Sequence, residues 1–311
     1  MRGQGGDGRV TVSARIRGDD VIAAQQEALA ALYRQHVGHG DRYALLDFPD
    51  HANVGDSAIW LGEIAMLRAI TGRDPDHVCT WDAFDADAFC RDSPAGIVFL
   101  HGGGNLGDIW PHHQRFREAR LAEFRDRTIV QLPQSIHFRA REGLDHFAAC
   151  VAGHPDFHLY LRDAQSLALA QRLSCPVALA PDSAFALGAQ PRGPADCDLL
   201  MLMRTDDERV AGDRVPVPKG AVVLDWLEDG VLPAWEAGVP RPAHYERLAY
   251  ARVARGLTLL SRGRQIVTDR LHAHILALLL GIPHVALDNE YGKLSAYIAA
   301  WTAPSPLLLR E

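Results

Sequence analysis

The sequence predicts an α/β fold made of two Rossmann-like domains, and three observations support this prediction. Short runs of β-branched and aliphatic residues alternate with longer segments of helical pattern, which is typical of parallel strands joined by crossover helices. The alternation starts again after a stretch rich in proline and glycine, Gln190–Asp196. The chain of 311 residues is also long enough for two domains of ordinary size.

The first half of the chain contains five expected strands with helical segments between them. Each strand is followed by a polar or glycine-rich segment, and ligands of open α/β sheets bind at the carboxyl ends of the strands. The expected strands are Tyr43–Phe48, Gly96–His101, Thr128–Leu132, Phe157–Leu161 and Val177–Ala180, and the expected helices are Ser57–Ile70, His112–Arg125 and Asp163–Leu173.

The second half shows the same alternation of expected strands and helices. The expected strands are Asp198–Met203, Ala221–Asp225, Gln265–Thr268 and His284–Leu287, and the expected helices are His244–Arg262, Leu271–Leu280 and Gly292–Trp301. We therefore divide the chain into a flexible leader with a first helix (1–40), an N-terminal Rossmann-like domain (41–192) and a C-terminal Rossmann-like domain with a terminal helix (193–311). Two such halves facing a cleft form a GT-B-like arrangement.

Composition and charge favour a soluble, folded protein that acts on small ligands. Apolar residues make up 48% and charged residues 23% of the chain, as in ordinary globular proteins. The net charge of -7 argues against nucleic acid as a partner. The polar, glycine-rich start is unlike a signal peptide, and the longest apolar stretch, Ile275–Leu280, is too short for a membrane segment. We expect a cytoplasmic protein, and the sequence leaves open whether it forms a homo-oligomer.

The cysteines give no sign of a metal site or a disulfide framework. The chain has five cysteines, which is an odd number, and they are widely spaced without a CxxC motif. We therefore expect reduced thiols. They are Cys79, Cys90, Cys150, Cys175 and Cys197.

Three consecutive glycines, Gly102, Gly103 and Gly104, follow an expected strand and precede Asn105. Glycines at such a place allow backbone N–H groups to approach an anion, and a following helix would add its positive end. A tight strand-to-helix turn would have the same composition. Asn105 favours a ligand site because its amide can contact a ligand, although it can equally cap a helix.

The segment Asn53–Trp60 is the expected start of a helix. Asp56 or Ser57 can cap this helix, and for Ser57 capping is the preferred interpretation. Asp56 has a second interpretation, because a carboxylate at a helix start near a strand end can accept a proton. We include Asn53 and Asp56 among the candidate site residues.

Polar side chains also follow the strands of the second half. Arg270 and His272 occupy the turn into an apolar helix, where a guanidinium can bind an anion and an imidazole can transfer a proton near neutral pH. After the last strand, Lys293 can add charge to a phosphate site, and Asn289 and Tyr291 can form hydrogen bonds with a ligand. Two further strand-end candidates lie in the first half, namely Arg162 and Asp182.

Taken in order, seven segments of the chain resemble the polysaccharide pyruvyl transferase family of bacterial exopolysaccharide and capsule pathways. The similarity extends from about Tyr43 to Trp301. The segments are Asn53–Glu63, Phe99–Trp110, Gln131–Phe138, Leu161–Ser166, Ala180–Phe185, Thr268–Pro283 and Asp288–Trp301.

The resemblance implies that the protein transfers a pyruvyl group from phosphoenolpyruvate to sugar hydroxyls, giving a pyruvate ketal and phosphate. The acceptor would be a sugar nucleotide, a lipid-linked sugar or a glycan, with no cofactor and no metal. The family's arginine–leucine–histidine element falls on Arg270, Leu271 and His272 and implies donor binding there, with a further arginine at Arg162. In this chemistry we expect His272 to act as general acid and Asp56 as general base, with the two roles exchangeable.

Two other enzyme classes remain as alternatives. A nucleotide-sugar glycosyltransferase of GT-B type would use the same architecture. A GDS-type serine esterase would use Ser57 as nucleophile, Gly104 and Asn105 as oxyanion donors, and His272 with Asp269 as base. The esterase is the weaker alternative because Ser57 follows a loop instead of a strand end.

Overall fold

The computed structural model describes residues 17–204, 216–288 and 292–309. The elements of the first half are α1 (Gly18–Tyr33), β1 (Tyr43–Leu46), α2 (Val54–Thr71), β2 (His77–Cys79), α3 (Ala86–Asp92), β3 (Ile97–Leu100), β4 (Gly103–Gly107), α4 (Pro111–Glu123), β5 (Ile129–His137), α5 (Arg141–Ala152), β6 (Phe157–Leu161), α6 (Ala164–Ala170), β7 (Val177–Leu179) and the 3₁₀ helix η1 (Ser183–Leu187). The second half contains β8 (Cys197–Leu202), β9 (Val222–Leu224), α7 (Arg241–Ser261), β10 (Gly263–Thr268), α8 (Leu271–Leu279), β11 (His284–Ala286), α9 (Lys293–Tyr297) and the π-helical turn η2 (Ile298–Thr302).

The first half forms a parallel sheet of seven strands. Its order is β2-β1-β3-β5-β6-β7, and β4 also pairs with β5. β3 and β4 lie end to end beside β5, because Leu100 pairs with Gln131 and Gly103 pairs with Gln134. All strands are parallel, so their carboxyl ends share one edge, as the crossover pattern of the sequence predicts.

Helices cover both faces of this sheet. Successive strand residues point to opposite faces, and the core divides accordingly. Leu45 belongs to a cluster with residues of α1 and α2, such as Leu29 and Trp60, whereas Leu46 belongs to a second cluster with residues of α3, α4 and α5, such as Phe147. This two-sided covering explains why the strands are almost wholly apolar.

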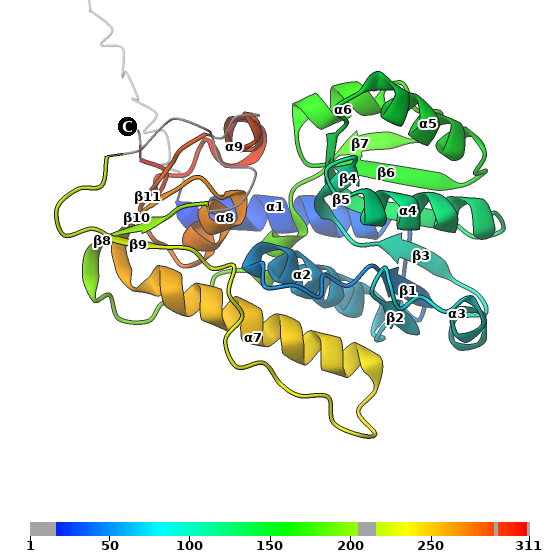
Figure 1. The fold of residues 1–311 in the computed structure, drawn as a ribbon, viewed down its shortest axis with the longest axis horizontal. Helices are drawn as coiled ribbons and strands as arrows, with labels where there is room; N and C mark the ends of the chain where they lie inside the picture. The colour runs from blue at the N-terminus through cyan, green and yellow to red at the C-terminus, as the bar shows by residue number, and fades with distance from the viewer. Residues whose placement is uncertain (1–16, 205–215, 289–291, 310–311) are drawn as a thin grey trace, which may run out of the picture.

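The second half forms a parallel sheet of four strands in the order β11-β10-β8-β9. In Figure 1 this sheet lies to the left of the larger one, with α1 and α2 between them and the long helix α7 below. The first core cluster continues into the smaller sheet through Leu200, Ile266 and Leu276, so one apolar core joins the two halves. The predicted α/β class with parallel sheets is confirmed, while the GT-B-like arrangement and the domain division stay predictions.

The structure contains β2, α3 and α5, which the sequence did not predict, and two predicted segments differ in form. The glycine segment does not turn into a helix: residues Gly103–Gly107 continue as β4, and α4 begins only at Pro111. The fifth strand extends through Pro133 to His137, because this proline lies where the pairing with β6 shifts register and its missing N–H is tolerated. In the described part of the chain, no helix has the length and apolar character needed to cross a bilayer.

Candidate functional site

A pocket of about 650 Å³ lies where the carboxyl ends of the first sheet meet the second half. Its volume is in the range of about 300–1,000 Å³ that is typical of small-molecule sites. Loops of both halves line it, so the glycine segment and the Arg270–His272 turn share one cavity. The predicted site residues among its lining are Asn53, Asp56, Gly104, Asn105, Arg162, Arg270 and His272.

Arg162 and His272, which lie in different halves of the chain, meet on one carboxylate. Nη1 of Arg162 donates to Oδ2 of Asp182 at 2.7 Å, and Nε2 of His272 lies 3.3 Å from the same oxygen. Burial alone would raise the pKa of Asp182, but the charges of His272 and Arg162 hold it well below its usual range. Asp182 itself is fully buried and is not among the lining residues, so its observed role is to position the side chains of Arg162 and His272.

Arg270 is held at the start of α8 by an ion pair. Its Nη2 donates to Oδ2 of Asp225 at 2.8 Å, and its side chain is almost wholly buried. The starts of three helices face the pocket. The start of α8 contributes Arg270, the start of α2 contributes Asp56, and the start of α4 contributes His112. Three helix N-termini at one cavity, together with two arginines, favour an anionic ligand.

Asp56 lies at the same cavity in the first turn of α2. Its Oδ2 accepts a hydrogen bond from Nδ2 of Asn53 at 2.8 Å and lies 3.6 Å from Nε2 of His51. Burial would raise the pKa of Asp56, but the neighbouring charges of His51 and His272 outweigh this effect and lower it. At neutral pH Asp56 is thus a carboxylate that can accept a proton.

The three consecutive glycines do not form the expected anion-binding segment of backbone N–H groups. The amide of Gly102 donates to Oε1 of Glu63 at 2.8 Å, so this N–H is not available to a ligand. Gly102 and Gly103 do not line the pocket. Gly104 does, and a Cβ at this position would come within 3.0 Å of Nη2 of Arg162. A side chain at this position would crowd the guanidinium, which would have to shift by a few tenths of an ångström.

Asn105 lines the pocket but is not a helix cap. Its side-chain oxygen accepts hydrogen bonds from Nη2 of Arg117 at 2.9 Å and from Nε2 of Gln134 at 2.8 Å. The structure does not place the side chains of three other predicted residues. Asn289 and Tyr291 lie outside the described residues, and of Lys293 only the backbone is described, as the first residue of α9.

The first turn of α2 corrects the expectation for Ser57. The helix begins at Val54, and its cap is Asn53, whose Oδ1 accepts the amide hydrogen of Gly55 at 3.2 Å. Ser57 is fully buried, and its hydroxyl makes no hydrogen bond to any described residue. It does not line the pocket, so the geometry does not support a serine nucleophile.

Replacing Ser57 by alanine should therefore leave turnover unchanged, because this hydroxyl contacts neither the pocket nor His272. The measurement is the steady-state rate of the pyruvyl transfer that the family resemblance implies. A serine-reactive phosphonate should likewise fail to label the protein. Loss of activity in Ser57→Ala, together with labelling of Ser57 in the wild type, would instead support the esterase.

Sequence reasoning missed a buried pair of ionisable groups, Glu63 and His101. Nδ1 of His101 lies 2.7 Å from Oε2 of Glu63, and both side chains are at most 2% exposed. Nε2 of His101 has no hydrogen-bond partner among the described residues, and His101 lines the pocket. Burial lowers the pKa of His101, but the charge of Glu63 outweighs it and raises this pKa. The sequence signal was Glu63 itself, an acid within the apolar pattern of α2.

A second carboxylate–histidine pair lies beside the pocket. Nδ1 of His113 is 2.8 Å from Oδ2 of Asp47, and His113 lines the cavity. Asp47 has φ of 73°, the only positive φ among the described residues other than glycine. Such a backbone conformation costs about 1–3 kcal/mol and is concentrated at functional sites. The pair fixes the orientation of the His113 ring.

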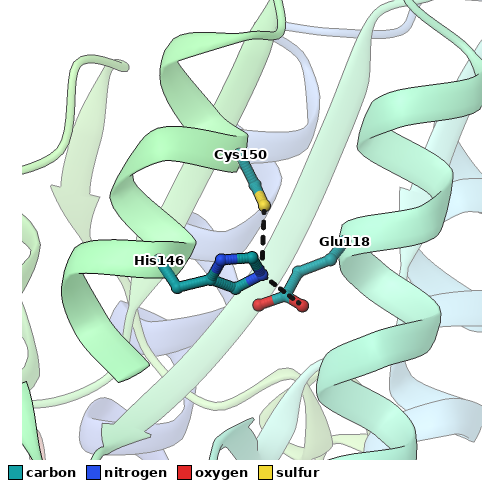
Figure 2. Close-up of side chains that lie close together, drawn as sticks. All are labelled: Glu118, His146 and Cys150. Atoms are coloured by element: carbon teal, nitrogen blue, oxygen red, sulfur yellow. Dashed lines mark hydrogen bonds and ion pairs between the residues drawn. The ribbon is translucent and has the colours of Figure 1, made fainter. Parts of the chain in front are cut away.

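A cluster of side chains with metal-ligand chemistry lies away from the pocket. Figure 2 shows Glu118 of α4 facing His146 and Cys150, which lie one turn apart on α5. Nε2 of His146 is 3.5 Å from Glu118 Oε2 and 3.8 Å from Cys150 Sγ. His146 is 68% exposed and none of the three residues lines the pocket, so this is a surface cluster.

The fold and the pocket together define a class of protein: an α/β protein with a cavity whose arginines, histidines and carboxylates suit a small anionic substrate and proton transfer. Residues 53–291 match the model of the polysaccharide pyruvyl transferase family. The chain belongs to this family.

Named relatives agree with this assignment. The chain is 32% identical over 307 residues to Pyruvyl transferase 1 of Schizosaccharomyces pombe, with 91% of this chain and 75% of that protein covered. It is 30% identical to the putative pyruvyl transferase EpsO of Bacillus subtilis, with 85% and 87% covered. An uncharacterized protein of Klebsiella pneumoniae has the same fold, with a TM-score of 0.60, 19% identity and coverage of 92% and 97%.

Proposed function

We propose that the protein transfers the pyruvyl group of phosphoenolpyruvate to hydroxyls of a sugar, with release of phosphate. The observation that carries this proposal is the set of anion-binding groups at one pocket. In a chain of net charge -7, Arg162 and Arg270 line one cavity at which three helix N-termini converge, and each guanidinium is held in place by a carboxylate. A donor with a carboxylate and a phosphate can use such groups, and a neutral substrate does not need them.

The proposed reaction has two bond-forming steps. A proton is added to the methylene carbon C3 of the donor, and a sugar hydroxyl attacks C2 and gives up its own proton. The bond between C2 and the phosphate oxygen then breaks, and phosphate leaves. A second hydroxyl of the same sugar attacks C2 and loses its proton, which closes the ketal. The overall change is donor plus diol to ketal plus phosphate.

The pocket supplies groups for the proton transfer to C3 and for the removal of the hydroxyl protons, one of which leaves with the phosphate. Asp56, a carboxylate at neutral pH, suits the base that accepts the hydroxyl proton. His272, oriented by Asp182, suits the acid that protonates C3. His101 is a further candidate acid, because it lines the cavity and Glu63 holds its Nδ1, while its Nε2 has no hydrogen-bond partner among the described residues. The proposed steps use no metal or cofactor, and Arg162 and Arg270 suit binding of the donor's anionic groups.

Arg270→Gln should weaken phosphoenolpyruvate binding by about 10- to 100-fold, because hydrogen bonds to charged groups contribute about 1.5–3 kcal/mol. Calorimetry with phosphoenolpyruvate alone measures this effect. The matched control is Arg264→Gln, an exposed arginine of β10 that does not line the pocket. Unchanged affinity in Arg270→Gln would remove this residue from the donor site.

The whole proposal is tested by incubating the protein with phosphoenolpyruvate and a panel of glycans and sugar nucleotides. Phosphate release and an acceptor mass increase of one pyruvate less one water are the expected results. UDP-sugars offered as donors without phosphoenolpyruvate test the glycosyltransferase alternative. Transfer of a sugar from them, with no phosphate release from phosphoenolpyruvate, would overturn the proposal.

A further inference from the structure

Two tryptophans stand exposed at the rim of the pocket. Trp81 is 41% and Trp110 is 47% exposed, and both line the cavity. The ring of His112 lies between them, with its centroid 4.6 Å from that of Trp81 and 6.4 Å from that of Trp110. We call these three residues the aromatic wall. Large exposed aromatic surface beside a cavity marks a binding site, because water solvates it poorly.

The aromatic wall lies far from the arginine anchors along the sheet. Trp81 follows β2 at one edge of the sheet, and Arg162 follows β6, which is four strands away in the order β2-β1-β3-β5-β6. Neighbouring strands are about 4.8 Å apart, so the two strand ends are separated by about 19 Å. This distance separates strand ends, and side chains extend into the space between them. A three-carbon donor bound at Arg162 does not fill that width, so the pocket has room beside the donor for a second ligand that reaches the aromatic wall.

The charges around the aromatic wall differ from those at the arginine end. Two carboxylates, Asp50 and Asp82, line the cavity with it. Asp82 is held in place by the hydroxyl of Thr80, which donates to its Oδ1 at 2.6 Å. Asp50 accepts a hydrogen bond from Nη2 of Arg252 at 3.0 Å. Burial lowers the pKa of the third wall residue, His112, which is therefore neutral at neutral pH.

We propose that the aromatic wall is the acceptor subsite, and that it binds a pyranose ring of an uncharged glycan. The apolar C–H face of the sugar stacks on Trp81 and Trp110, and the carboxylates of Asp50 and Asp82 accept hydrogen bonds from its hydroxyls. A nucleoside diphosphate sugar fits this end poorly, because its pyrophosphate would approach the carboxylate of Asp82, which Thr80 holds without neutralising it. Asp50, by contrast, is already paired with Arg252. This inference rests on the proposed pyruvyl transfer and selects one acceptor class within it.

The test uses Trp81→Ala and Trp110→Ala, with Trp235→Ala as matched control, since Trp235 is 53% exposed and does not line the pocket. Oligosaccharides ending in galactose, glucose, mannose or N-acetylglucosamine are compared with UDP-sugars as acceptors. Each pocket variant should raise the acceptor KM by about tenfold, which corresponds to about 1.4 kcal/mol. The affinity for phosphoenolpyruvate, measured by calorimetry, should not change. Trp235→Ala should behave as wild type.

Two results would overturn the acceptor subsite. One is an unchanged acceptor KM in both pocket variants, and the other is a clear preference for UDP-sugars over oligosaccharides. Failure of the pyruvyl transfer itself has a different signature, because the wild type would then neither bind phosphoenolpyruvate nor release phosphate. In that case quenching of tryptophan fluorescence by oligosaccharides still tests the wall. Quenching that Trp81→Ala abolishes would support sugar binding, and its absence in the wild type would refute it.

Discussion

His272→Gln should lower kcat by about 10²- to 10⁴-fold, the usual contribution of a positioned proton-transfer group. Glutamine can still donate a hydrogen bond to Asp182, so the anchor of Arg162 is preserved while the titrating group is lost. Donor affinity should therefore remain close to that of the wild type. Single-turnover phosphate release measures the chemical step, and calorimetry with phosphoenolpyruvate measures binding.

The matched control for this prediction is His146→Gln, which replaces a histidine of the surface cluster. Its turnover should equal that of the wild type. Asp182→Asn separates orientation from proton transfer, because it weakens the anchors of both His272 and Arg162. We expect this variant to lose both kcat and donor affinity. A wild-type kcat in His272→Gln would exclude His272 as the proton donor.

The regular elements of the fold could be predicted because their signal is local. The strand Phe157–Leu161 was predicted with its observed bounds, since an uninterrupted apolar run between polar segments is typical of a strand buried on both faces. The missed strands had no such signal. β2 has three residues, and Gly103–Gly107 contains three glycines, which disfavour strands. Its strand conformation depends on pairing with β5, a contact between segments far apart in the sequence.

The location of the candidate site could be predicted from one rule, namely that ligands of open α/β sheets bind at the carboxyl ends of the strands. That rule brings Asp56, Arg162, Arg270 and His272 to one pocket because parallel strands share a carboxyl edge. It says nothing about which groups touch. The bridge formed by Asp182 joins residues of two separate sheets, and the Glu63–His101 pair joins a helix to a strand end. Such contacts depend on how the elements pack.

The sequence also could not predict that the tryptophans of the aromatic wall are exposed, because exposure depends on the folded structure. Trp60 and Trp81 are the same residue type in neighbouring parts of the sequence, yet Trp60 is fully buried and Trp81 is 41% exposed at the pocket rim. A sequence pattern cannot separate a packing tryptophan from one that faces a ligand. The distinction comes from the sheet edge on which the loop after β2 lies.

Glu63→Ala should lower the free energy of unfolding by about 3–5 kcal/mol, because it leaves the buried His101 without its partner. Glu63→Gln should cost less, since its amide oxygen can still accept the Gly102 hydrogen bond. Urea denaturation measures both values. The control Glu123→Gln removes a half-exposed carboxylate of α4 and should change stability little. Equal stabilities for the wild type and Glu63→Ala would contradict the buried ion pair.

The same pair gives stability a pH dependence whose sign can be tested. The pKa of His101 is raised in the folded protein, so above about pH 6.5 the native state retains a proton that the unfolded chain has released. The raised pKa of Glu63 acts in the same direction. Stability from this pair should fall as pH rises through the pKa of His101. In Glu63→Gln the charge of Glu63 is lost. Burial, which lowers the pKa of His101, then acts against only the smaller raising effects of Asp56 and Asp47. Stability should therefore fall as pH decreases below about 6.5. The urea concentration at the unfolding midpoint, measured from pH 5 to 9 in steps of about one pH unit, would show this reversal. If the midpoint changed with pH in the same way in the wild type and in Glu63→Gln, the charge coupling between Glu63 and His101 would be refuted.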